Sequence, residues 1–398
     1  MLSHEISISN RQARQFLLLK HGLIGEYKFQ GKQGIIDFIR QTGCIQYDPI
    51  DICGRNAELT LQSRVKGFTK EMLYSLLYED RLLLDYPDKN TAIILTEDLP
   101  YFERSRESAR SRAAEHPELE ALMKQVLAFI EENGVACPDD IKLESNFEWR
   151  AYIVWSSGKN LSSSVLEQLY GMGDLIIHHK KGTRKYYDLA KRHIPKKILS
   201  APDPLPNKTD YLKWRLLRYI GAVGFLWNRM SNTIWNIKSD LRKKLFNELL
   251  EEGRITAATV EGIKETLYFR TEDMPLMEAA QKNNEFTPRC EFIAPLDCFI
   301  WDRKLTKAIF NFDYTWEIYT PIIKRKYGHY VLPIIIGERF IGRIEAASKT
   351  NTLIVKNIWY EDDIKPTAKI KSEIKKCLQR FARFNNCEFL PEIRTPCP

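Results

Sequence analysis

The spacing of apolar and polar positions predicts three consecutive segments with one order of elements, helices followed by a two-stranded hairpin. The second segment is the clearest, because Ser164 and Glu167 form a capping-box pattern for a helix that ends near Gly171. A strand over 174–179, a short basic turn and a strand over 184–188 then form the hairpin. A helix that leads into a basic hairpin is typical of a winged helix.

The other segments complete the predicted organisation. The first segment has its hairpin over 82–96 and the third over 255–270, and a proline-rich connector at 195–206 precedes the third. The pattern then changes to strands over 330–360 and an amphipathic helix over about 365–385. We predict an α+β fold with three tandem winged-helix domains and a C-terminal small β-barrel or sheet with a terminal helix, bounded at 1–100, 101–195, 196–285 and 286–398.

Composition allows a nucleic-acid partner. The 398 residues include 60 Lys and Arg against 52 Asp and Glu, a net charge of +8 that permits an anionic partner without requiring one. No apolar stretch reaches the roughly 20 residues that a membrane-spanning helix needs, and the N-terminus shows no signal-peptide pattern. The eight cysteines include no CxxC pair. Reduced thiols in a cytoplasmic protein without a membrane partner are therefore expected.

The motifs of several reaction classes are missing. The sequence has no GxxxxGK(S/T) or GxGxxG phosphate loop, no GxSxG nucleophile elbow and no zinc-deaminase signature. HxxxH spacing is also absent. His178 and His179 are neighbours in a predicted strand, so their side chains are expected on opposite faces. We therefore expect no cofactor and no metal.

The segment 44–50 is the strongest candidate for chemistry. It follows an amphipathic helix that stops at Gly43, and the pattern predicts a short extended run closed by Pro49. Because side chains alternate along a strand, Gln46 and Asp48 are expected on one face, with apolar residues on the other. An amide beside a carboxylate can hold a water molecule for attack. A half-buried strand with a polar outer face is the alternative.

Basic and aromatic residues concentrate in three places, at 62–66, in the second hairpin at 180–185 and at 314–327. Cations in these places can contact phosphates, and aromatic rings can stack on or wedge against unstacked bases. The alternative for each is a solvated surface or an ordinary aromatic core.

Two separated blocks of sequence resemble one protein family. The first block is Ile45-Gln46-Tyr47-Asp48-Pro49, then Arg55, then Leu59-Thr60-Leu61-Gln62-Ser63-Arg64. The second contains Pro295-Leu296-Asp297, Trp301-Asp302-Arg303, Phe312-Asp313-Tyr314, Glu317-Ile318-Tyr319, Lys324-Arg325, Tyr330-Val331-Leu332-Pro333 and Gly342-Arg343. With these blocks in this order, the chain resembles the AlkZ/YcaQ-type winged-helix DNA glycosylases.

The resemblance implies excision of N7-alkylated guanine from double-stranded DNA and unhooking of interstrand crosslinks made through that atom. It also implies that Gln46 and Asp48 are catalytic, as the family's Gln-x-Asp motif. A monomer is expected, since no dimerisation coiled coil is evident. The candidate DNA-binding residues are Arg55, Arg64, Lys66, Lys180, Lys181, Arg184, Tyr314, Lys324, Arg325 and Arg343.

The chemistry of the motif fits such a reaction. An alkylated guanine is already cationic and leaves readily, so the enzyme must mainly orient water and stabilise positive charge on the sugar. Asp48 can do this as an anion, with Gln46 orienting the water. No lysine lies in the motif, which favours simple hydrolysis to an abasic site. Members of the family commonly carry His soon after the position of Arg55, whereas this chain has Asn56-Ala57-Glu58.

A different class of protein stays open. Winged helices occur most often in transcription regulators, and a non-catalytic DNA-binding protein would also explain the charge. A regulator usually binds as a dimer and places a recognition helix against base edges.

Overall fold

The computed structural model describes residues 5–144, 160–229, 237–282 and 285–389. The chain divides into two compact units, unit 1 (Met1–Leu73 with Thr209–Pro398) and unit 2 (Tyr74–Lys208). This division is coarser than the four predicted domains, which stay a prediction. Residues 74–100, predicted with the first winged helix, fall in unit 2.

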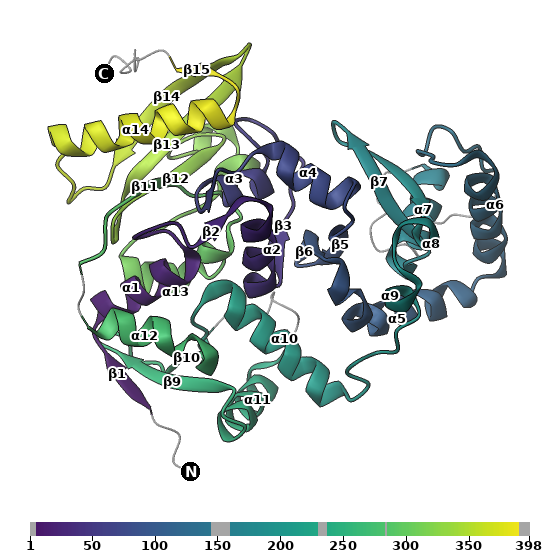
Figure 1. The fold of residues 1–398 in the computed structure, drawn as a ribbon, viewed down its shortest axis with the longest axis horizontal. Helices are drawn as coiled ribbons and strands as arrows, with labels where there is room; N and C mark the ends of the chain where they lie inside the picture. Colours follow the sequence, from purple (N-terminus) through teal and green to yellow (C-terminus); the bar gives the residue numbers. More distant parts are fainter. Residues whose placement is uncertain (1–4, 145–159, 230–236, 283–284, 390–398) are drawn as a thin grey trace. The chain divides into compact units, whose positions relative to one another are not determined.

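Most of the helices belong to unit 1 (Figure 1). The first one begins with a complete capping box between Ser9 and Gln12 and ends at Gly22, whose φ of 64° closes the helix in the left-handed region. The helices of unit 1 are α1 (Asn10–His21), α2 (Gly31–Thr42), α3 (Asn56–Gln62), α4 (Lys70–Tyr78, which continues into unit 2), α10 (Lys208–Val223, which starts at the end of unit 2), α11 (Ser239–Glu251), α12 (Met274–Gln281), α13 (Arg303–Phe310) and α14 (Ala368–Phe384).

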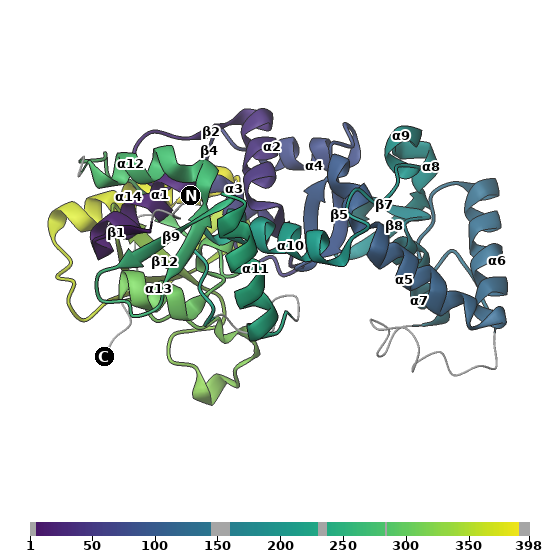
Figure 2. The same cartoon turned by 90° about the horizontal axis from the view of Figure 1, so that it is seen from below.

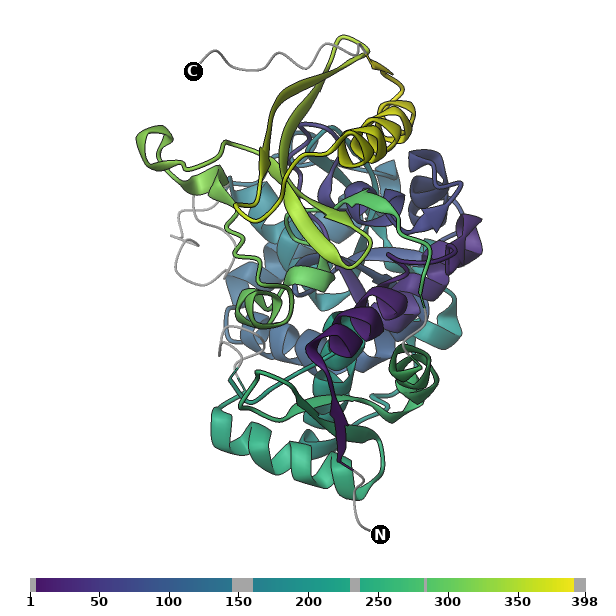
Figure 3. The same cartoon turned by 90° about the vertical axis from the view of Figure 1, so that its left-hand side faces the viewer.

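The N-terminal strand of unit 1 joins a hairpin far along the sequence. Strand β1 (Ile6–Ile8) lies parallel to β9 (Ile255–Val260), which pairs antiparallel with β10 (Leu267–Arg270), as the purple strand beside the green ones shows in Figure 3. The hairpin predicted over 255–270 is thereby confirmed. A second pair, β2 (Phe29–Gln30) with β4 (Val65–Lys66), brackets α2 and α3. Strand β3 (Cys44–Gln46) follows α2 directly.

The C-terminal part of unit 1 is a five-stranded sheet. Its order is β11 (Cys290–Phe292), β12 (Val331–Ile336), β13 (Arg339–Lys349), β14 (Thr352–Tyr360) and β15 (Glu388–Phe389). Helix α14 lies along this sheet in Figure 1, and Ile374, Leu378 and Phe381 share one core with the strands. The predicted strands and terminal helix are confirmed, as is the α+β class.

Unit 2 contains two antiparallel hairpins and shorter helices. The hairpins are β5 (Leu83–Asp88) with β6 (Asn90–Leu95) and β7 (Leu175–Lys181) with β8 (Arg184–Leu189), so both predicted hairpins are confirmed. The helices are α5 (Glu103–Ala114), α6 (Pro117–Asn133), α7 (Leu161–Met172), α8 (Ala190–His193) and α9 (Lys196–Leu199). Residues 147–155, which the sequence places between α6 and α7, lie outside the described residues.

Short 3-10 helices connect several of these elements, namely η1 (Thr96–Phe102) in unit 2, and η3 (Thr271–Asp273), η4 (Cys298–Ile300), η5 (Glu317–Tyr319) and η6 (Ile322–Lys324) in unit 1. The seven cysteines within the described ranges are all free thiols. No helix in those ranges has the length and apolar character that crossing a membrane requires.

Candidate active site

An abrupt helix end positions the Gln-x-Asp segment. Helix α2 stops because Gly43 adopts φ 78°, and its amide donates to the Ile39 carbonyl at 2.7 Å. The carbonyl of Gly43 then accepts a hydrogen bond from Arg218 on α10. A Cβ at Gly43 would lie 2.4 Å from the Arg218 side chain, so glycine meets a steric as well as a conformational requirement. The conformation of Gly43 and its bond to Arg218 therefore fix the direction in which β3 leaves α2 at Cys44.

Asp48 lies beyond the strand and is held by a turn. The observed strand ends at Gln46, so the pleat does not extend to Asp48, and the alternation expected from the sequence does not by itself set the two side chains on one face. Instead, Oδ1 of Asp48 accepts a hydrogen bond of 2.9 Å from the Ile50 amide. This is an Asx turn, a local bond that fixes the direction of a carboxylate.

The environment of Asp48 favours a less readily ionised carboxyl. Its side chain is half-buried, and burial raises the pKa of the Asp48 carboxyl, whereas the bond from the Ile50 amide opposes that shift. The Asp48 carboxyl is thus partly shielded from water, and its Oδ1 accepts a hydrogen bond from the Ile50 amide. Such a carboxylate can accept a proton from a bound water molecule.

Gln46 is buried, and a neighbouring side chain fixes its main chain. The amide nitrogen of Asn56 donates to the Gln46 carbonyl at 2.7 Å, and the Asn56 oxygen accepts from the Leu296 amide at 2.9 Å. Both side chains are almost fully buried. Asn56 therefore ties the Gln46–Asp48 segment to the loop before η4.

The loop after the motif is attached to the C-terminal sheet. The amide of Ser348 on β13 donates to the Ile52 carbonyl at 2.8 Å, and the Asn385 side chain donates to the Cys53 carbonyl at 3.0 Å. Within the loop, the Asp51 carboxylate accepts from the Gly54 amide at 3.0 Å. The segment 51–54 is thus fixed at Ile52 and Cys53 by distant parts of unit 1 and closed by its own Asp51–Gly54 bond.

Arg55 is oriented by a buried carboxylate. Glu58 is almost fully buried and accepts bonds from the Arg55 amide at 3.1 Å and from its guanidinium at 3.3 Å. Lys70 lies 3.2 Å from the same carboxylate. The Arg55 side chain stays partly exposed and also approaches Asp51, at 3.8 Å. The residues that replace the family's usual His region therefore support the first turn of α3.

Comparison with known proteins decides the family. The family model described as DNA glycosylase AlkZ-like matches residues 39–384 of this chain. The chain belongs to the AlkZ-like DNA glycosylase family. The family predicted from the two sequence blocks is thereby confirmed. The solved structure of Streptomyces sahachiroi DNA glycosylase AlkZ is similar with a TM-score of 0.63 and 16% identity, covering 97% of this chain and 99% of that one. At this identity the likeness shows a shared fold.

In this AlkZ-like glycosylase, one predicted DNA contact is an internal ion pair. Arg64 is completely buried, and its Nη2 lies 2.8 Å from Oδ2 of Asp297, which is equally buried. Its Nη1 donates to the Thr60 carbonyl at 2.9 Å, and the guanidinium lies over the Phe38 ring. The prediction that Arg64 contacts DNA is corrected, because its charge is neutralised inside unit 1.

Two further predicted contacts are also internal. Tyr314 is buried and donates from its hydroxyl to the Val331 carbonyl at 2.7 Å. Arg343 is buried, pairs with Glu361 and lies 4.2 Å from the centre of the Tyr327 ring. The DNA-binding assignment is corrected for both residues. Tyr314 instead holds the start of β12, and Arg343 on β13 holds the residue that follows β14.

The second hairpin contributes one internal cation and two exposed ones. Lys180 has a nearly buried side chain and lies 2.6 Å from the Asp85 carboxylate, which corrects its assignment as a DNA contact. Lys181 is exposed, and Arg184 is half exposed with Asp139 at 2.7 Å. Lys66 on β4 and Lys324 in the loop before β12 are exposed as well. These four cations are available to phosphates.

The basic and aromatic segment at 314–327 contains an exposed apolar loop tip, and the sequence pattern did not indicate that exposure. The loop between α13 and β12 projects from the body of unit 1 (Figure 2). At its tip Tyr319, Ile322 and Ile323 are 81%, 77% and 92% exposed. Lys324 follows directly, and half-buried Arg325 donates to a main-chain carbonyl of the same loop. In sequence, a run of apolar residues beside cations resembles an ordinary strand. Only the exposure of these side chains in the structure shows that they form a loop tip.

A single carboxylate closes the base of this loop. Glu317 accepts hydrogen bonds from the amides of Lys326, Tyr327 and Gly328 at 2.8, 2.9 and 3.2 Å. Because these bonds join the two sides of the loop, the tip is presented on a fixed base.

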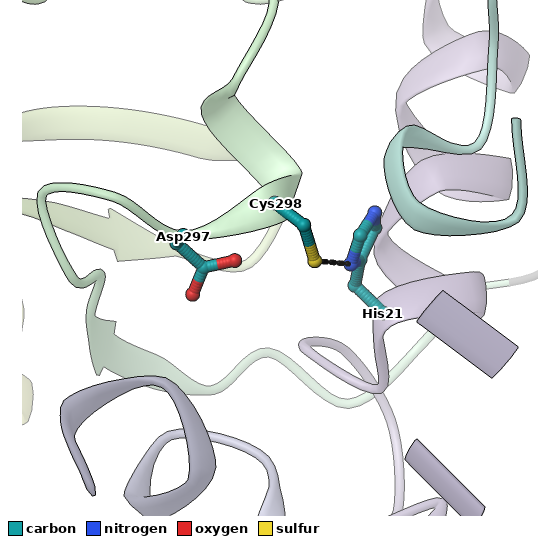
Figure 4. A group of neighbouring side chains, drawn as sticks. All are labelled: His21, Asp297 and Cys298. Carbon is teal, nitrogen blue, oxygen red and sulfur yellow. Dashed lines mark hydrogen bonds between the residues drawn. The ribbon is translucent and has the colours of Figure 1, made fainter. Parts of the chain in front are cut away.

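Two groups of side chains in the described residues have ligand types suited to a metal ion. The first is His21, Asp297 and Cys298, shown in Figure 4, where the thiol points at the imidazole and the carboxylate points elsewhere. Burial holds the pKa of His21 well below and that of Cys298 well above the usual values, and Asp297 is occupied by Arg64 and by the Phe299 amide. These three side chains are therefore packed in the interior of unit 1 with the Asp297 carboxylate already bound by other protein groups.

The second group corrects a prediction about the hairpin of unit 2. His178 and His179 were expected on opposite faces, but their Nδ1 atoms lie 2.8 Å apart. The reason is a register shift between Ile177 and His179, a β-bulge that breaks the alternation. His178 can share a metal with Asp188 and His193, although Asp188 already pairs with Arg192. The expectation of no metal stays a prediction.

Proposed function

We propose that this chain hydrolyses the N-glycosidic bond of N7-alkylated guanine in double-stranded DNA and unhooks crosslinks made through N7, leaving an abasic site. The observation that carries the proposal is the half-buried Asp48 carboxylate, oriented by the Ile50 amide and close in sequence to buried Gln46. The segment 44–50 offers this one acidic group and no lysine. Excision of an N7-alkylated guanine needs neither a general acid nor a Schiff base, so these side chains suffice for it.

The reaction is a displacement at C1′ of the deoxyribose. The C1′–N9 bond breaks, its electron pair neutralises the cationic base, and positive charge develops on the sugar. Asp48 stabilises this charge and accepts a proton from the attacking water, while Gln46 orients the water. The products are the free alkylbase and an abasic site, so the strand itself is not cut. General-base assistance of this kind typically contributes about 10²–10⁴-fold.

Exposed cations support binding to the DNA backbone. We assign phosphate contacts to Lys66, Lys181, Arg184 and the pair Lys324 and Arg325, and retain partly exposed Arg55 as a contact near the motif. The exposed tip with Tyr319, Ile322 and Ile323 has the composition of a wedge placed between base steps. The chain is proposed to act as a monomer, since Gln46 and Asp48 and the residues that hold them belong to one unit.

The direct test is release of free 7-methylguanine. A duplex with one 7-methylguanine should yield the free base by mass spectrometry, and its strand should stay intact until alkali cleaves the abasic site. A duplex crosslinked through N7 of two guanines should separate into single strands under denaturing conditions. Intact DNA binding without base release would instead favour a winged-helix transcription regulator. Release from the monoadduct alone would remove crosslinks from the substrate range.

The rate of base release should fall as the pH is lowered, and the midpoint of that fall should lie above the pKa of an exposed aspartate. Burial raises the pKa of Asp48, and the reaction needs its ionised form, so activity is retained above that pKa and lost as the pH drops through it. The midpoint should exceed the reference value of about 3.9. Single-turnover rates from pH 4 to 8, corrected for spontaneous base loss, measure it. A midpoint at or below the reference value would contradict the role of burial.

A further inference from the structure

A basic, aromatic cavity lies in unit 1 apart from the Gln46–Asp48 segment. Its volume is about 750 Å³, and none of its lining residues comes from 44–50. Three parts of unit 1 form it: Tyr27, the turn between β4 and α4 at 65–71, and the end of α14 at 380–386. Gln62 of α3 completes the lining.

The charge of this cavity is strongly positive. Lys66, Lys70, Arg380 and Arg383 line it against the single carboxylate of Glu71. A concave surface with one sign of charge raises the local concentration of anions.

Two of the four cations are already committed to the protein. Lys70 lies 3.2 Å from Glu58 and 4.8 Å from the centre of the Phe384 ring. Arg380 donates to the Cys290 carbonyl at 2.6 Å and lies 3.4 Å from Glu291. These contacts hold the wall of the cavity and leave less charge for a ligand.

The other two cations have no internal role. Lys66 and Arg383 are exposed, and neither charged group has a hydrogen-bond or ion-pair partner within residues 5–144, 160–229, 237–282 and 285–389. They come from β4 and from the end of α14, so they stand on different walls of one cavity. An anion between them would satisfy both.

The turn between the two walls leaves room for a ligand. Gly67 adopts φ 72°, and no atom lies within 4 Å of the place where a Cβ would stand, so the main chain there is open to the cavity. The nine-residue helix α4 begins just after it, and Thr69 accepts from the Met72 amide at 3.4 Å. Glu71 in the first turn of this helix already offsets its positive end, so the attraction for an anion comes from the cations.

An aromatic ring offers a stacking surface beside the cations. Phe68 is half-buried, and the ring of Phe384 lies beside it at a centroid distance of 6.1 Å with the planes tilted by 34°. Phe384 has Lys70 over it, and Tyr27 has Arg289 over it at 3.8 Å. Phe68 is therefore the ring of the cavity on which a planar ligand can lie most directly.

We propose that this cavity binds one unstacked nucleotide of a DNA strand, with its phosphate between Lys66 and Arg383 and its base on Phe68. A base on an aromatic ring has left the duplex stack, so the preferred ligand is single-stranded or locally unpaired DNA. The inference rests on the proposed function only in that the chain acts on DNA. It adds a strand-binding site that does not contact the reacting atoms.

The test compares single-stranded and duplex DNA. Fluorescence anisotropy of a labelled 12-mer, alone and annealed, is measured for wild type and for the double variant Lys66→Ala/Arg383→Ala at several salt concentrations. Single-strand affinity should fall at least tenfold, and the slope of log K against log salt should lessen by roughly 0.7 for each cation removed. The matched control Lys371→Ala/Lys375→Ala also removes two exposed cations, both from α14 and outside the cavity, and should change affinity less than twofold.

A second variant tests the base-stacking half of the proposal. Phe68→Leu should weaken single-strand binding roughly tenfold while leaving the salt slope unchanged, because it removes stacking and no charge. Competition by dAMP would show that the cavity accepts a free nucleotide. Lack of competition, with strand binding still dependent on Lys66 and Arg383, would assign the cavity to polymeric DNA. Thermal denaturation of each variant verifies that it is folded.

Several results would overturn the proposal. These are unchanged single-strand binding in Lys66→Ala/Arg383→Ala, an equal loss in the α14 control, or a loss confined to duplex binding. If wild type releases no base but single-strand binding depends on these two cations, the proposed function fails and the strand-binding site stands.

Discussion

Replacing Asp48 by Asn is expected to lower the single-turnover rate of 7-methylguanine release by about 10²–10⁴-fold. An asparagine oxygen can still accept the Ile50 amide, so the turn is kept while the negative charge and the proton acceptor are lost. The rate measured at saturating enzyme separates this effect from any change in DNA affinity. Anisotropy with an undamaged duplex should give the wild-type dissociation constant.

A matched control lies three residues away. Asp51 accepts the Gly54 amide in a comparable turn, so Asp51→Asn also removes a carboxylate next to the motif while keeping its local bond. It should retain most of the rate. Gln46→Ala should reduce the rate strongly but less than Asp48→Asn, since orientation of the water is lost and its proton acceptor remains. A full rate in Asp48→Asn would refute the role assigned to the carboxylate even if base release itself is observed.

Replacing Arg64 by Met is expected to destabilise the protein by about 3–5 kcal/mol, because Asp297 would be left as a buried charge without a partner. Methionine keeps much of the apolar stem that packs in this place. Urea denaturation at pH 7, followed by circular dichroism, measures the loss. The nearby Lys66→Ala change removes an exposed cation and should stay within about 0.5 kcal/mol of wild type.

The double variant Arg64→Met/Asp297→Asn separates pairing from packing. With both charges gone, no unpaired ion is buried, and the asparagine oxygen can still accept the Phe299 amide. Stability should therefore recover in part relative to Arg64→Met. If Arg64→Met unfolds like wild type and instead loses DNA affinity tenfold, the residue reaches DNA and the internal assignment is wrong.

Local patterns predicted the hairpins and the terminal helix well. The hairpins of unit 2 depend on short turns next to alternating strands, and α14 depends on apolar residues at helical spacing, so neighbours in sequence carry the information. The prediction failed where the partner is distant. Arg64 looks like a surface cation in its own segment, and only Asp297, 233 positions away, makes it an internal one. Lys180 and Asp85 repeat this case across 95 positions.

Alternation was the other source of error. It predicted a strand through Asp48, whereas β3 ends at Gln46, and it separated His178 from His179 across a bulge. The end of a strand and the position of a bulge depend on the register with the partner strand. The local sequence of one strand does not determine that register. The apolar tip at Ile322 and Ile323 was missed for a related reason, since exposure is decided by the rest of the fold.

The hydrogen bonds between Leu296 and Asn56 and between Arg64 and Asp297 also set the order of events during synthesis. They span 240 and 233 positions, so the N-terminal part of unit 1 cannot complete its interior until residues near 297 have left the ribosome. At about 5–20 residues per second this is a wait of roughly 10–50 s. The contiguous chain of unit 2 is made during that interval. A nascent chain that is released early would therefore carry the Gln-x-Asp sequence without the contacts that hold it.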